Sequence, residues 1–133
     1  MKIFQLSDPR NGWIDITFGQ TPDCYTFTAS DVPNDCLHDL AAAMARLLRH
    51  STDETVEFSL EPDFVTCRLH RDSNSVNLVL NHTNYVDPVF IGTFPLHSFA
   101  KRLRSELLRI EERYSAEDGW TQPFPDYEVN NLA

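Results

Sequence analysis

Histidine and cysteine are the residues of this chain that best suit metal binding or catalysis, and their spacing supports neither. The five histidines, at positions 38, 50, 70, 82 and 97, include no pair four residues apart, and the cysteines at 24, 36 and 67 form no Cys-x-x-Cys pair. Structural metal sites need such closely spaced ligands. The four glycines are isolated, so no phosphate-binding loop can be built from them. The sequence therefore predicts no metal and no cofactor.

Cys36 is the best candidate for a nucleophile, because it lies next to His38 near the start of a predicted helix. Cys67 and His70 would instead point to opposite faces of a strand. A nucleophile also needs an oriented base, so we expect all three thiols to be packed as small apolar side chains. We predict that the chain is not an enzyme. The alternative is a small enzyme that uses carboxylates or Cys36 in a pocket between sheet and helices.

Acidic residues are arranged in blocks along this chain, which has a formal net charge of −9. Residues 51–63 and residues 114–133 contain no lysine or arginine, and both segments are rich in carboxylates. A one-signed surface of this kind attracts a partner of opposite charge and speeds the encounter. The candidate partner-binding residues are Asp53, Glu54, Glu57, Glu61, Asp63, Glu117, Asp118 and Trp120.

Each of these features also has a purely structural explanation. The acids of 51–63 are also typical of a solvated sheet face or of an edge protected against aggregation. Trp120 is typical either of a cap over the core or of an interface anchor. The cations of the second helix favour a solvated helix face. They are Lys101, Arg102, Arg104, Arg109 and Arg113.

The order of the predicted elements indicates an α+β fold. Apolar residues alternate with polar ones in 13–18, 25–29, 56–61, 64–70 and 76–80, and shorter strands are expected at 2–6 and 89–94. Three- and four-residue steps predict a helix at 34–49, capped by Asn34 or Asp31, and a second helix opened by Pro95. We expect an antiparallel sheet of about six or seven strands with two helices packed on one face.

Length and composition bound the organisation of the chain. At 133 residues we expect one domain over 1–133, with the aromatic and acidic tail of 114–133 packed on the core. The odd set of cysteines fits a reducing compartment, and no signal peptide or membrane span is recognisable. We therefore expect a soluble cytoplasmic protein, a monomer or weak homodimer. The acidic composition disfavours nucleic acid as the partner, because phosphate binding needs a basic footprint.

Several segments, taken in order, resemble a family of small bacterial immunity proteins, which belong to contact-dependent growth inhibition and related polymorphic toxin systems. The resemblance implies a cytoplasmic, non-enzymatic protein that binds and neutralises a cognate toxin domain, often a nuclease. It transfers no binding residues, so the predicted surface depends on charge alone. A self-associating adaptor subunit is the remaining alternative. The segments are Gly12-Trp13-Ile14, Ser30-x-x-Pro33-Asn34-Asp35, Glu57-Phe58-x-Leu60-Glu61-Pro62, Arg71-Asp72, Pro95-Leu96-x-x-Phe99-Ala100 and Gly119-Trp120-x-x-Pro123-Phe124-Pro125.

Overall fold

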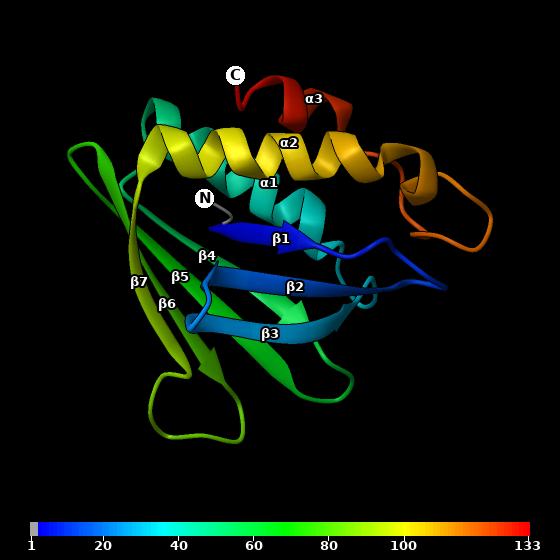
Figure 1. Cartoon of the computed structure of the whole chain (residues 1–133), viewed down its shortest axis with the longest axis horizontal. Helices are drawn as coiled ribbons and strands as arrows, with labels where there is room; N and C mark the ends of the chain where they lie inside the picture. The colour runs from blue at the N-terminus through cyan, green and yellow to red at the C-terminus, as the bar shows by residue number, and fades with distance from the viewer. Residues whose placement is uncertain (1–2) are drawn as a thin grey trace.

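Within residues 3–133, alternating apolar and polar residues form seven strands, which neighbour one another in chain order in one antiparallel sheet (Figure 1). The computed structural model describes residues 3–133, so the first two residues of the chain, including position 2 of the strand expected at 2–6, lie outside the described residues. The predicted α+β class and antiparallel sheet are confirmed. The strands are β1 (Phe4–Leu6), β2 (Trp13–Gln20), β3 (Asp23–Ser30), β4 (Asp53–Ser59), β5 (Phe64–Asp72), β6 (Ser75–His82) and β7 (Phe90–Pro95).

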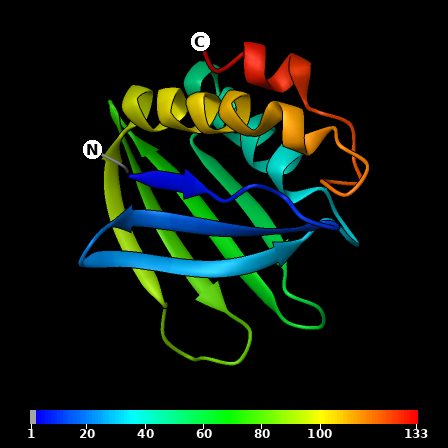
Figure 2. The ribbon, with the colours of Figure 1, turned by 45° about the vertical axis from the view of Figure 1, so that its right-hand side comes forward.

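In the described part of the chain three helices accompany the sheet: α1 (Cys36–Arg49), α2 (Leu96–Tyr114) and α3 (Asp126–Asn130). The first two follow the predicted apolar stripes, whereas α3 was not predicted, because five residues are too few to show a helical period. Figures 1 and 2 show the three helices gathered on the same side of the curved sheet. No described helix is long and apolar enough to cross a membrane.

The predicted cap of α1 was wrong, since the cap is Asp35 and neither Asn34 nor Asp31. The carboxylate of Asp35 accepts a hydrogen bond from the backbone N–H of His38 at 3.2 Å. Asp31 and Asn34 are engaged elsewhere: Asp31 binds Thr121, and the amide of Asn34 bridges to β4. Any of the three residue types suits a helix start, so tertiary contacts decided which one caps it.

The sheet bends sharply between β3 and β4, because these two strands are joined only at Ser30 and Ser59. The β2–β3 hairpin pairs along eight residues of each strand, and β4–β7 form a second continuous arm. The core lies between the arms and beneath the helices (Figures 1 and 2). At its centre the ring of Phe18 packs against four other aromatic rings, those of Phe4, Phe27, Phe58 and Phe99.

Side chains of α2 seal the outer edge of β1, which would otherwise expose unpaired backbone groups. Glu106 accepts a hydrogen bond from the N–H of Leu6 at 2.9 Å, and the guanidinium of Arg102 donates to the carbonyl of Phe4 at 2.9 Å. Arg109 donates to the carbonyl of Leu6 and to Glu106. The polar side of α2 is therefore only partly the solvated face that we expected, since Glu106 is 4% exposed.

Stability should depend on the charge of Glu106. Burial alone would raise the pKa of this carboxyl, but hydrogen bonds from Arg109 and Leu6 and the nearby guanidinium groups hold it below its ordinary value of 4.5. The charged Glu106 therefore makes its full contribution to the stability of the fold at pH values above 4.5, and this contribution is lost as the pH falls through the folded-state pKa. Glu106→Gln should be less stable at pH 7 and should lose less stability on acidification, measured by urea unfolding between pH 7 and pH 3.

The matched control for this prediction is Glu111→Gln on the same helix, because Glu111 is exposed and makes no ion pair within residues 3–133. Its free energy of unfolding should follow the wild-type pH profile. Equal slopes for the wild type and Glu106→Gln would contradict the assignment of Glu106 as the acid-sensitive carboxylate of this edge.

Candidate functional site

The structure divides the candidate acidic residues between two regions. Asp53, Glu54 and Glu57 lie on β4, and Glu61 and Asp63 lie in the turn that leads into β5. Glu117 and Asp118 lie in the turn after α2, where the carbonyl of Asp118 accepts a hydrogen bond from Asn11 at 2.7 Å. In Figure 1 this turn lies beside the β1–β2 turn, at a different corner of the molecule from the β4–β5 turn. The two acidic stretches therefore do not form one surface.

Trp120 and Asp118 serve the packing of the tail. The indole of Trp120 is 4% exposed and donates its N–H to the carboxylate of Asp35 at 3.0 Å. The carboxylate of Asp118 pairs with Arg113 at 3.0 Å. Trp120 is thus a core residue rather than an exposed anchor, and only Glu117 of this group is left exposed without an ion pair among the described residues.

Three of the segments that carry the family resemblance meet at this point. The backbone N–H of Gly12 donates to the carbonyl of Gly119 at 2.8 Å, and the N–H of Asp31 donates to the carbonyl of Gly12 at 3.0 Å. The carboxylate of Asp31 in turn accepts from the backbone N–H of Thr121 at 2.7 Å and from its hydroxyl. These segments therefore bind the C-terminal tail to the sheet, which is a structural role.

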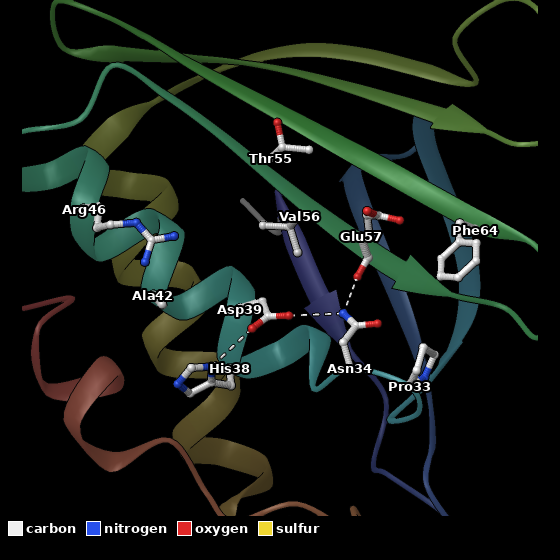
Figure 3. A pocket seen from close by; sticks show the side chains of 10 residues that line it. All are labelled: Pro33, Asn34, His38, Asp39, Ala42, Arg46, Thr55, Val56, Glu57 and Phe64. Atoms are coloured by element: carbon white, nitrogen blue, oxygen red, sulfur yellow. Dashed lines mark hydrogen bonds and ion pairs between the residues drawn. The ribbon is translucent and has the colours of Figure 1, made fainter.

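A groove runs along β4, between this strand and α1 (Figure 3). It has a volume of about 630 Å³ and is open to solvent on one side. Its walls combine apolar side chains with carboxylate, amide and guanidinium groups, so it is amphipathic. The lining residues are Pro33, Asn34, His38, Asp39, Ala42, Arg46, Thr55, Val56, Glu57 and Phe64.

Two polar bridges cross the groove. At one end the side-chain amide of Asn34 donates to the carbonyl of Glu57 at 2.8 Å and to the carboxylate of Asp39 at 3.1 Å. At the other end the guanidinium of Arg46 donates twice to Glu54, at 2.7 and 3.0 Å. This contact lowers the pKa of Glu54 and raises that of Arg46. Figure 3 shows the carboxylate of Glu57 directed away from Asn34 and Asp39.

The acids of 51–63 differ in how much charge they offer to a partner. Glu54 is neutralised by Arg46, and its side chain is only 13% exposed. Asp53 is exposed and contacts the ring of His70 at 2.7 Å, which lowers the pKa of Asp53. Glu57 and Glu61 are exposed and make no ion pair with any residue of 3–133. The free negative charge is therefore concentrated at Glu57 and at the β4–β5 turn.

Cations near this surface only partly offset it. Arg68 lies on β5 directly opposite Thr55. It is therefore diagonal to Asp53 and Glu57, which lie two residues to either side of Thr55, and long side chains can reach across this separation. Asp63 accepts a hydrogen bond from the amide of Asn84 and makes no ion pair in the described part of the chain. Arg46 and Arg68 are together outnumbered by the five carboxylates of residues 53–63, so the region keeps a negative balance.

The backbone of β4 is unpaired along the groove. Antiparallel pairing with β5 directs the N–H and C=O of alternate residues towards β5 and those of the others away from it. The carbonyl of Glu57 points into the groove, since it accepts from Asn34. The N–H and C=O of Thr55 and the N–H of Glu57 therefore point the same way. Within residues 3–133, β3 pairs with β4 only at Ser59.

Cys36 and Cys67 have the packed character that we expected, whereas the expectation was wrong for Cys24, which is exposed. Cys36 and Cys67 are completely buried, and burial raises the pKa of both far above the ordinary value for cysteine. Burial of this kind disfavours the thiolate, which is the nucleophilic form of cysteine, and so does not favour Cys36 as a nucleophile. His70 is exposed on the face of β5 opposite Cys67, as the alternation predicted. Among residues 3–133 no three metal-ligating side chains are grouped together.

Comparisons with known proteins find no matching family model, no similar curated protein and no similar solved structure. The functional argument therefore depends on the geometry and charge of the groove and of the β4–β5 turn, together with the resemblance of the sequence segments described above.

Proposed function

We propose that this chain is an immunity-type inhibitor, which binds a basic toxin domain and blocks its active site with the acidic surface around β4. The observation that supports it most directly is the exposure of Glu57 and Glu61, which make no ion pair among residues 3–133, beside an unpaired strand edge. A toxin that cleaves nucleic acid needs cations to hold phosphates. Carboxylates on a rigid sheet can take the place of those phosphates.

In this proposal the protein acts in the cytoplasm as a monomer or weak homodimer and needs no cofactor. Its docking surface consists of Asp53, Glu57, Glu61 and Asp63. Two residues of the surface inferred from sequence are left out of the proposal: Glu54, whose charge is already paired, and Trp120, which is buried. Glu117 and Asp118 are also left out, because they lie in a different region from β4.

The experiment that tests the function is co-purification of the tagged chain from its native host, followed by expression of the captured partner alone. We expect one stoichiometric partner with a basic domain that arrests growth when expressed alone. Co-expression of this chain should restore growth. A stoichiometric partner that is harmless by itself, or growth arrest that this chain leaves unrelieved, would show that the proposed function is wrong.

A further inference from the structure

The strand edges of β1 and β4, which both lie next to a helix, differ in how far side chains bind their backbone groups. The edge of β1 is closed by α2, whose Glu106, Arg102 and Arg109 bind the backbone of Phe4 and Leu6. Along the edge of β4, side chains of the described residues bind only the carbonyl of Glu57, through Asn34, and the carbonyl of Asp53, through Ser51, so Thr55 between them is left open. An open strand edge is a template for pairing with another chain. Strand addition at such an edge is a recurrent mode of peptide recognition.

We infer that the β4 edge receives an extended, lysine- or arginine-bearing segment of the partner, which pairs with Thr55 as an additional strand. This inference deepens the proposed function and rests on it for the identity of the partner. The backbone N–H and C=O of Thr55 provide one donor and one acceptor that face the groove, and the N–H of Glu57 provides a second donor. Three backbone groups are therefore free for an incoming strand.

The charges beside this edge specify a basic occupant. In an added strand, alternate side chains would lie beside Thr55 and Glu57 on the exposed face of the sheet. Glu57 has no ion pair among the described residues, and Asp39, at the same end of the groove, contacts only the amide of Asn34 and the ring of His38. Cationic side chains on that face would pair with Glu57. The side chains of opposite orientation would face Ala42 and Asp39 on α1.

The other unpaired edges lack this complementarity. The groove beside β7 is lined by one carboxylate, Asp23, and otherwise by uncharged residues. The residues of β3 that precede Ser30 also make no pair with β4 in the described structure, but Asp23 is the only charged residue of this strand. The β4 edge alone combines free backbone groups with several carboxylates among the described strands.

A peptide probe tests the edge without the toxin. The probe is a ten-residue peptide that alternates lysine with valine, and its counterpart replaces lysine with glutamate. We expect the lysine peptide to shift the amide resonances of Thr55 and Glu57 and to slow their hydrogen exchange. The glutamate peptide should leave both unchanged. No response of these two amides to millimolar lysine peptide would overturn the inference, as would an equal response to both peptides.

Variants of Thr55 separate strand pairing from general attraction. Thr55→Val keeps the backbone N–H and should keep the response to the lysine peptide. Thr55→Pro removes that N–H, which makes no bond to β5, and proline is tolerated at such an edge position. It should abolish the response while the thermal unfolding midpoint stays close to that of Thr55→Val. If Thr55→Pro unfolds, the hydrogen exchange of Thr55 and Glu57 in the wild-type protein decides the question.

The same two variants distinguish failure of the inference from failure of the proposed function. If both relieve the toxicity of the captured partner equally well, the edge inference is wrong and the inhibitor function stands. If the lysine peptide pairs with the edge but the captured partner is harmless, strand addition stands and the inhibitor function is wrong.

Discussion

Replacement of Trp120 by alanine is expected to lower the free energy of unfolding by about 3–5 kcal/mol. The indole is buried against the ring of Tyr114, at a centroid distance of 6.0 Å, and it donates to the capping carboxylate of α1. Its removal leaves a cavity and takes from Asp35 one of its two side-chain hydrogen bonds. Urea unfolding at neutral pH, followed by circular dichroism, measures the loss.

Two control variants sharpen this prediction. Tyr127 lies in the same tail and is 76% exposed. Tyr127→Ala should therefore change the free energy of unfolding by no more than about 0.5 kcal/mol. Trp120→Phe keeps most of the buried ring and loses the hydrogen bond, so its cost should be intermediate. A loss below about 1 kcal/mol for Trp120→Ala would mean that the tail is not part of the cooperative core.

Reversal of the two free carboxylates, as Glu57→Lys with Glu61→Lys, is expected to weaken binding of the captured toxin domain by at least about tenfold. The change replaces two attractions with two repulsions beside the proposed docking edge. It should leave the stability of the protein nearly unchanged, because neither side chain makes an ion pair within residues 3–133. Isothermal titration of the purified partner measures the affinity.

The matched control for this double variant is Glu111→Lys with Glu112→Lys on α2. These two carboxylates are also exposed, and the change in net charge is the same. Affinity should fall much less in the control. An equal loss in both double variants would show that net charge, rather than the β4 surface, governs binding.

Local pattern was sufficient to predict most of the fold. Period-two alternation located the strands, and the apolar stripes located α1 and α2 within a few residues of their ends. The burial of Glu106 was missed because a glutamate among arginines on a helix has the pattern of a solvated face. The burial depends on the β1 edge, because the backbone N–H that this carboxylate binds belongs to Leu6, 100 positions away in the chain. α3 was missed because it is too short to show a period.

The candidate site was harder to predict, because charge blocks say nothing about pairing in three dimensions. Glu54 on β4 is neutralised by Arg46 on α1, and no local sequence spacing predicts that contact. Trp120 belongs to the core because Asp35 accepts its N–H across 85 positions of the chain. The open edge of β4 could not be predicted at all, since the strand order was not readable from the sequence. A sign was available in hindsight: α1 separates β3 from β4, whereas the other strands follow one another directly.

The most direct test of an acidic docking surface around β4 is the rate of association with the captured toxin domain, measured by stopped flow as the salt concentration rises from about 20 to about 500 mM. For the wild type and for the Glu111→Lys, Glu112→Lys control, we predict a fast rate at low salt that falls steeply. For Glu57→Lys, Glu61→Lys we predict a slow rate that depends little on salt. The same steep dependence and the same low-salt rate in all three proteins would contradict the proposed role of this surface.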